Sequence, residues 1–212
     1  MGWKQCLSLP LGAASNGAAY AINNSGTAVG WTDPYRYAGS YIKTPSMWID
    51  GELTLLGGLY SDTTPGKAFD INDAGHAVGW SYTEYEQRAF YWADGVMRPL
   101  AINDEYNQQS GASGINDNDE IVGWISYMGG THAALWQDGV LLDINDLVTT
   151  QPGWTLTEAW SINDSGLIVA NESNWDTRDS HIVVLVPVPE PSSILVVLCG
   201  VGGLGLLRRK KP

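Results

Sequence analysis

The stretch that decides the fold is Ala68-Phe69-Asp70-Ile71-Asn72-Asp73-Ala74-Gly75-His76-Ala77-Val78-Gly79-Trp80. It reads as a strand, a tight Asn-Asp-Ala-Gly turn and a second strand, because strand-forming residues flank residue types that favour turns. The pattern occurs four times, and its repeated asparagine falls at positions 23, 72, 116 and 163. These steps of 49, 44 and 47 residues are typical of propeller blades or repeat arrays.

Each repeat continues beyond this hairpin in a similar order. In the first three repeats a third strand carries a tryptophan, an Asp-Gly turn follows, and a fourth short strand ends the unit. Four short antiparallel strands per unit are typical of a propeller blade. We therefore predict an all-β fold over residues 5–186, a β-propeller of four-stranded antiparallel blades with four blades in the ring.

The fourth repeat departs from this order, since after residues 162–169 it has one further strand, 180–186, and no Asp-Gly turn. Residues 5–12 alternate apolar and polar side chains before they break, and they resemble the fourth strand at 53–57. We expect this N-terminal strand to complete the last blade and close the ring, which would remove two exposed sheet edges. Further repeats upstream of Met1 would enlarge the ring.

Two recurring positions point to packing between blades. One position holds isoleucine in every copy and the other holds valine, and both are expected to fill the contacts between blades: Ile22, Ile71, Ile115 and Ile162, and Val29, Val78, Val122 and Val169. Gly30, Gly79 and Gly123 lie inside predicted strands, which indicates a bulge or a close approach of two backbones.

The composition excludes several classes of protein. The 25 glycines, 10 tryptophans and 10 tyrosines, with only 16% charged residues, suit a β protein with many turns. The formal net charge of −12 repels phosphate backbones, so no nucleic-acid partner is expected. Two cysteines exclude a disulfide framework.

The end of the chain has a different character. Residues 187–193 form a proline-rich linker, and residues 194–207 contain no charged side chain. Arg208-Arg209-Lys210-Lys211 follows at once. Residues 194–212 therefore predict a short transmembrane helix with a basic tail, although the apolar run is shorter than the usual span of about 20 residues. The positive charges would keep the C-terminus in the cytoplasm and residues 1–189 outside.

These features resemble a sorting signal. Pro189, Glu190 and Pro191, the apolar segment, and the basic end that begins with Arg208 and Arg209 together look like the PEP-CTERM signal of Gram-negative bacteria. The resemblance implies export, anchoring in the inner membrane, processing by an exosortase, and then a place at the cell surface or in the extracellular matrix. It also implies a link to exopolysaccharide and biofilm. No signal peptide is evident at the N-terminus, which departs from this pattern.

The repeats themselves resemble the HAF family of extracellular repeat proteins. That family's units run Ala-x-x-Ile-Asn-x-x-Gly-x-x-Val-Gly and then His-Ala-Phe-Leu-Trp. Here the second element appears at 88–92 and 132–136 and is reduced in the first and last repeats. The resemblance implies a surface protein and supplies no catalytic residues.

The candidate metal ligands favour a structural interpretation. His76, His132 and His181 are too scattered for a zinc site, and no phosphate-binding or nucleophile-elbow motif is present. The acidic turn at 116–120 offers clustered oxygens that Ca²⁺ could use. Asn and Asp are also ordinary turn residues, so we expect no metal or other cofactor, with Ca²⁺ as the alternative.

The loops between repeats hold the remaining candidates. Exposed aromatic residues in loops 33–41 and 80–85 could stack on sugars: the tyrosines Tyr35, Tyr37, Tyr41, Tyr82 and Tyr85, together with Trp80. Two of four loop carboxylates could instead serve as an acid–base pair for glycan cleavage: Glu84, Glu86, Asp104 and Glu105. We expect a non-enzymatic cell-surface or matrix protein. The alternatives are a glycan-binding propeller and a glycan-cleaving enzyme.

Overall fold

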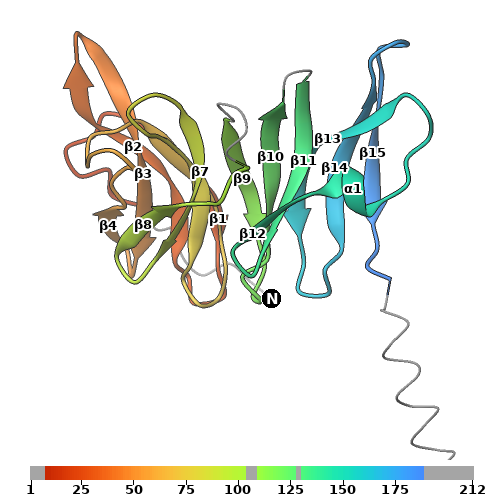
Figure 1. Ribbon diagram of the computed structural model, residues 1–212. Helices are drawn as coiled ribbons and strands as arrows, with labels where there is room; N and C mark the ends of the chain where they lie inside the picture. The colour runs from red at the N-terminus through yellow and green to blue at the C-terminus, as the bar shows by residue number, and fades with distance from the viewer. Residues whose placement is uncertain (1–7, 104–108, 128–129, 189–212) are drawn as a thin grey trace, which may run out of the picture.

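The computed structural model describes residues 8–103, 109–127 and 130–188 of the chain. Within them the chain forms four antiparallel sheets that follow one another in sequence order (Figure 1). The first sheet consists of β1 (Gly17–Ile22), β2 (Ala28–Tyr37), β3 (Ser40–Ile49) and β4 (Glu52–Leu55). The second consists of β5 (Gly66–Ile71), β6 (Ala77–Tyr82), β7 (Gln87–Ala93) and β8 (Val96–Pro99).

The third sheet contains β9 (Ser110–Ile115), β10 (Ile121–Tyr127), β11 (Gly130–Gln137) and β12 (Val140–Asp143), and the short helix α1 (Ile144–Leu147) follows it. The fourth sheet has three described strands, β13 (Trp154–Ile162), β14 (Ile168–Asn174) and β15 (Asp179–Leu185). In every sheet the strands neighbour one another in chain order. The prediction of an all-β chain made of repeated antiparallel sheets is confirmed.

Two kinds of turn recur, an asparagine turn in all four sheets and an Asp-Gly turn in the first three. In the second repeat, the Asn72 side-chain oxygen accepts the backbone N–H of His76 at 3.0 Å, and Gly75 takes a positive φ of 84°. Asp94 and Gly95 both have positive φ, as the tightest hairpin turns require, and the other Asp-Gly pairs do the same. Turn chemistry in the sequence therefore sets the strand register.

The core lies between consecutive sheets. Ile71 on the inner strand β5 belongs to the same buried cluster as Val29 and Met47 of the first sheet. The corresponding pairs are Ile115 with Val78, and Ile162 with Val122. The expected packing role of the recurring isoleucine and valine is confirmed at these three interfaces between sheets.

The strand glycines are required by close backbone contact. A Cβ atom on Gly79 would lie 1.9 Å from the carbonyl oxygen of Lys67 on the neighbouring strand β5. Gly30 and Gly123 face the same contact in the first and third sheets. The register of β5 against β6 shifts between Ala68 and Asp70, which marks a bulge beside Gly79. The prediction of a bulge with close approach is confirmed.

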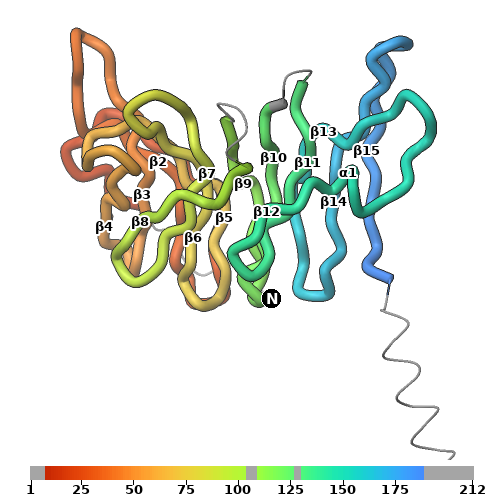
Figure 2. The backbone as a smooth tube through the Cα atoms, in the orientation of Figure 1, coloured from red at the N-terminus to blue at the C-terminus, as the bar shows by residue number. Residues whose placement is uncertain are grey.

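The four sheets do not close into a ring among the described residues. The first and fourth sheets lie at opposite ends of a row, and strands of different sheets make extensive contact only where the sheets are consecutive (Figures 1 and 2). The fourth sheet therefore has one neighbour, where the two middle sheets have two each.

The N-terminal segment takes a different place from the one predicted. Residues 8–12 form no strand, and the Pro10 carbonyl accepts the indole N–H of Trp48 in the first sheet at 2.7 Å. The backbone N–H groups of Ser15 and Asn16 donate to Asp33 of β2 at 2.7 Å each. The prediction that this segment completes the last blade is therefore wrong for residues 8–12. Residues 5–7 lie outside the described part of the chain.

The predicted membrane anchor cannot be compared in the same way. Residues 189–212, with the whole apolar run and the basic tail, lie outside the described residues. Within the described ranges, no helix has the length and apolar character to cross a bilayer.

Candidate functional site

A hollow lined by aromatic residues lies where the first two sheets meet. Three segments form it: the end of the β2–β3 hairpin, the linker between β4 and β5, and the β6–β7 hairpin. The hollow has a volume of about 710 Å³. Six aromatic residues line this hollow, which we call the aromatic groove: Tyr37, Tyr41, Tyr60, Trp80, Tyr82 and Tyr85.

The structure brings four of the five predicted tyrosines into this groove. They come from the β2–β3 hairpin (Tyr37 and Tyr41) and from the β6–β7 hairpin (Tyr82 and Tyr85). Tyr37 is 76% exposed and Tyr85 is 85% exposed, so both rings are open to solvent. Tyr35 is half-buried on β2, opposite Ile42, and does not line the groove.

The loops that carry these rings are held by local hydrogen bonds. The Thr83 backbone N–H donates to the Glu86 carbonyl at 2.8 Å, and the Thr83 hydroxyl accepts the backbone N–H of Glu86 at 3.2 Å. In the linker, the Thr64 hydroxyl accepts the Ser61 N–H at 2.9 Å. The groove is thus bordered by ordered turns.

Contacts with neighbouring side chains hold several rings of the groove. Trp80 and Tyr82 meet edge to face, with centroids 5.6 Å apart. The Arg36 guanidinium lies 4.5 Å from the centroid of Tyr41 and the Tyr41 hydroxyl accepts a hydrogen bond from Ser15 at 3.1 Å, which together hold that ring. Lys43 and Glu84 add one charge of each sign to the lining, with several hydroxyl groups beside them.

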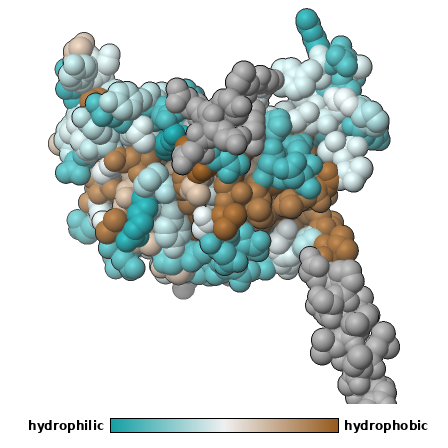
Figure 3. Space-filling view, viewed as in Figure 1, coloured by the Kyte–Doolittle hydropathy of each residue, from teal (hydrophilic) through white to brown (hydrophobic). Residues whose placement is uncertain are grey.

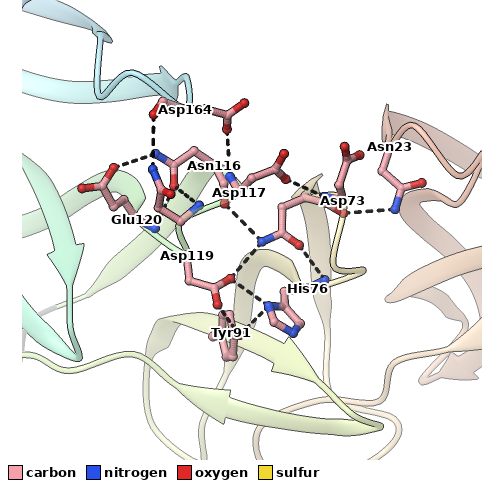
Figure 4. Close-up of polar contacts among 11 residues, drawn as sticks. Asn23, Asp73, His76, Tyr91, Asn116, Asp117, Asp119, Glu120 and Asp164 are labelled. Atoms are coloured by element: carbon pink, nitrogen blue, oxygen red, sulfur yellow. Dashed lines mark hydrogen bonds and ion pairs between the residues drawn. The ribbon is translucent and has the colours of Figure 1, made fainter.

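A second recurring arrangement joins the sheets at the inner turns (Figure 4). The first three of the four repeated asparagines donate their side-chain amides to the backbone carbonyl of the equivalent asparagine in the next sheet. The three bonds are Asn23 to Asn72 at 3.0 Å, Asn72 to Asn116 at 3.1 Å, and Asn116 to Asn163 at 3.0 Å. We call this chain of bonds the turn array.

The next residue of each turn adds a parallel set of bonds. The Asp73 carboxylate accepts the Asn24 N–H at 2.9 Å, and the Asp117 carboxylate accepts the Asp73 N–H at 2.8 Å. Asp164 accepts the Asp117 N–H at 2.9 Å. The pKa of Asp73 lies below its ordinary value because the Asn24 backbone and side chain both donate to the carboxylate.

The acidic turn at 116–120 uses its oxygens in the same way. Asp119 accepts the Asn72 amide at 2.8 Å and pairs with His76 Nδ1 at 2.7 Å, while Glu120 accepts the Asn116 amide at 2.6 Å. The Asp119 contacts join the second and third sheets, and the Glu120 contact closes its own turn. Among the described residues, no three His, Cys, Asp or Glu side chains are grouped so that they could hold a metal ion.

The histidines lie apart from one another and from the aromatic groove. His76 lies beside Tyr91, whose hydroxyl is 2.8 Å from Nδ1. Burial, and then the negative charge of Asp119, raise the pKa of Tyr91 to about 12. His132 pairs with Asp143 at 2.6 Å, and His181 stacks on Trp154 with centroids 4.3 Å apart. The first two contacts link neighbouring strands, and the third links β13 and β15 across β14 in the fourth sheet.

The candidate carboxylates of the cleavage hypothesis do not form a described pair. Glu84 lines the aromatic groove, and Glu86 forms an ion pair with Arg88. Asp104 and Glu105 lie outside the described residues, as do the sorting-motif residues Pro189, Glu190, Pro191, Arg208 and Arg209.

Sequence reasoning missed one residue of the groove. Tyr60 is 63% exposed and comes from the linker between the first and second sheets. Its only signal in the sequence is an aromatic residue among Gly, Ser and Thr. The sequence does not show that this linker crosses beside the two hairpins.

The fold and the turn array define a repeat protein whose antiparallel sheets are joined by turns of one repeated type. A family model described as "Protein of unknown function (DUF3466)" matches residues 13–184, and the chain belongs to this family. Residues 187–211 match the PEP-CTERM protein-sorting motif, which implies an exported protein that an exosortase processes and sorts to the cell surface. No curated protein matches the chain.

Proposed function

We propose that this protein is a non-enzymatic component of the cell surface or extracellular matrix that binds polysaccharide in the aromatic groove. The observation that carries the proposal is the convergence of six aromatic rings from three segments at one hollow. Exposed aromatic clusters of this kind mark interaction sites on soluble domains. The resemblance of the repeats to HAF proteins, and the link of PEP-CTERM proteins to exopolysaccharide, support the same setting.

The charges of the chain and of the groove limit the class of polysaccharide that is expected to bind. The formal net charge of −12 opposes the approach of acidic polysaccharides, whereas the groove itself has both a lysine and a glutamate in its lining. Aromatic rings provide flat apolar faces that need no charged partner. Neutral polysaccharides are therefore the expected ligands.

The non-enzymatic part of the proposal rests on the lining of the groove. Most glycan-cleaving enzymes use two carboxyl groups on either side of the scissile bond. Glu84 is the one carboxylate among the described lining residues. An assay for new reducing ends tests this part. If a bound polysaccharide is cleaved, and cleavage is lost on substitution of one Asp or Glu, the protein is a glycan-cleaving enzyme instead.

A binding experiment tests the proposal. The purified full chain is applied to an array of neutral and acidic glycans, and the best neutral glycan is then titrated by calorimetry. Tyr85→Ala and Tyr37→Ala are each expected to weaken binding about tenfold or more, which is about 1.4 kcal/mol. Trp160→Ala is the matched control, because Trp160 is 48% exposed and lies outside the groove. Equal affinity in all three variants would contradict the assignment of the site.

A further inference from the structure

Consecutive sheets pack together through one repeated contact that has two sides. One side of this contact is exposed on the first sheet, and the other side is exposed on the fourth sheet. In that contact, the inner strand of one sheet packs its isoleucine against a valine and its cross-strand partner in the preceding sheet. Ile71, Ile115 and Ile162 are buried in this way, with 6%, 5% and 7% of each side chain exposed. The first sheet has no preceding sheet among the described residues.

At that end the isoleucine is uncovered. Ile22 occupies the same turn position and is 67% exposed. We call Ile22, with the neighbouring Asn23 and Asn24, the head surface. Because three copies of this isoleucine are buried by a preceding sheet, exposure of the fourth indicates a missing neighbour of the same kind.

The other end lacks the opposite half. Val29 and Met47 pair across β2 and β3, and are 0% and 1% exposed under the second sheet. The equivalent pair on β14 and β15 is Val169 with Val184, which are 37% and 60% exposed. Ile182 lies on the same face of β15 and is 77% exposed. We call these three residues the tail surface.

Figure 3 shows apolar residues gathered over the third and fourth sheets, down to the point where the described chain ends. The opposite face of the fourth sheet, with Ile168 and Ala170, is already buried against the third sheet. The tail surface is therefore an additional apolar face on the last sheet, beyond the one the fold uses.

The turn array has matching open ends. The amides of Asn23, Asn72 and Asn116 each donate to the following sheet, so the direction of the array is the same throughout. Within the described residues, the Asn163 amide has no acceptor, and no asparagine from another sheet donates to the Asn23 carbonyl. The turn array thus ends at Asn163 of the last sheet with a donor, and it begins at Asn23 of the head surface with an acceptor.

The N-terminal segment leaves room for a preceding sheet. The Pro10 carbonyl accepts the Trp48 indole N–H at 2.7 Å, and the Ala101 carbonyl accepts the Trp136 indole N–H at the same distance. The Asn16 carbonyl accepts the Asp33 N–H, as the Pro65 carbonyl accepts that of Tyr82. Residues 8–16 therefore lie where the linkers lie inside the molecule, between a sheet and its predecessor.

We infer that a second copy of this chain docks head to tail, with its head surface on the tail surface of the first copy. A molecule with this repeat carries both the isoleucine that packs on such a surface and the acceptor for the Asn163 amide, and a second copy carries them in the required order. The contact is heterologous, so the rotation between copies decides whether two chains close a ring or a longer row forms.

Sedimentation velocity of the purified full chain in mild detergent tests this inference. At physiological ionic strength, which screens the repulsion between acidic chains, the protein is expected to self-associate. Ile22→Asp and Val184→Asp are each expected to weaken association at least about tenfold, because a charge would be buried in an apolar contact. Val140→Asp is the control, since Val140 is 55% exposed on β12 and belongs to neither surface. Circular dichroism verifies that all variants fold.

Mixing the two disrupted variants makes the test specific. One intact head and one intact tail remain in the mixture, so one-to-one dimers are expected although each variant alone is monomeric. A symmetric contact between identical surfaces would not be restored in this way. A monomeric wild type, association that survives both substitutions, or a mixture that stays monomeric would each overturn the inference.

Discussion

The side chain of the repeated asparagine makes two kinds of contact. Its oxygen closes its own turn, and its amide reaches the next sheet, so the same residue sets local geometry and joins repeats. Asn72 is 4% exposed and donates to both the Asn116 carbonyl and Asp119. Asn163 closes its turn with the same type of oxygen contact and has no described acceptor for its amide.

This pair of residues gives a matched comparison. Asn72→Ala is expected to lower the free energy of unfolding by about 1 to 2 kcal/mol more than Asn163→Ala, because only Asn72 loses hydrogen bonds between sheets. Urea unfolding in dilute solution, followed by circular dichroism, measures both. Similar losses in the two variants would assign the asparagine to its turn alone.

The sequence predicted the turn role of these residues and missed the bond to the next sheet. Asn, Asp and Gly favour turns through local chemistry, which a short window of sequence contains. The acceptor of the Asn72 amide lies 44 residues away. Its position depends on how two sheets pack, so no local pattern reveals it.

At the scale of the element, the N-terminal segment shows how a correct local resemblance can lead to a wrong placement. Residues 8–12 do resemble the end of a fourth strand and the linker that follows it. Their hydrogen bonds to Trp48 and the first sheet place them as a linker. The aromatic groove is a similar case, because its tyrosines were identified from composition while Tyr60 depends on the path of a linker.

The docking of this segment is expected to depend on pH through Asp33. Burial raises the pKa of the Asp33 carboxyl, but hydrogen bonds from the Asn16 side chain and from the backbone of Asn16 and Ser15 outweigh it, so the pKa lies below its usual range. A lowered folded-state pKa adds stability above the unfolded value of 3.8. That stability is lost as the pH falls through the folded value.

Amide hydrogen exchange of residues 8–16 measures this effect. Asp33→Ala is expected to accelerate amide exchange at Ser15 and Asn16 at neutral pH. When the pH is lowered, exchange in the segment is expected to increase less in this variant than in the wild type. Asp50→Ala is the control, because Asp50 lies in an exposed hairpin turn of the same sheet. Unchanged protection in Asp33→Ala would show that Trp48 and apolar contacts alone hold the segment.

At the scale of the whole molecule, periodicity predicted the number and kind of sheets but not their closure. Each sheet forms from contacts within one repeat of about 45 residues, and those contacts are encoded locally. Closure depends on a small rotation between neighbours that accumulates over the row. The recurring isoleucine and valine indicate that sheets pack together, and they carry no information on the angle.

An open row has a consequence for stability. In repeat arrays each unit is stabilised by its own contacts and by its immediate neighbours, so a terminal unit with one neighbour opens at a lower free energy. Among the described residues, the fourth sheet has one neighbour and three strands, whereas the third sheet lies between two others. The amides of β14 and β15 are therefore expected to exchange faster than those of β10 and β11 in the monomeric Ile22→Asp variant. β6 and β7 of the second sheet serve as an internal reference with two neighbours. Uniform protection across all four sheets would contradict the row, because it would require the molecule to unfold as one unit with no weaker end.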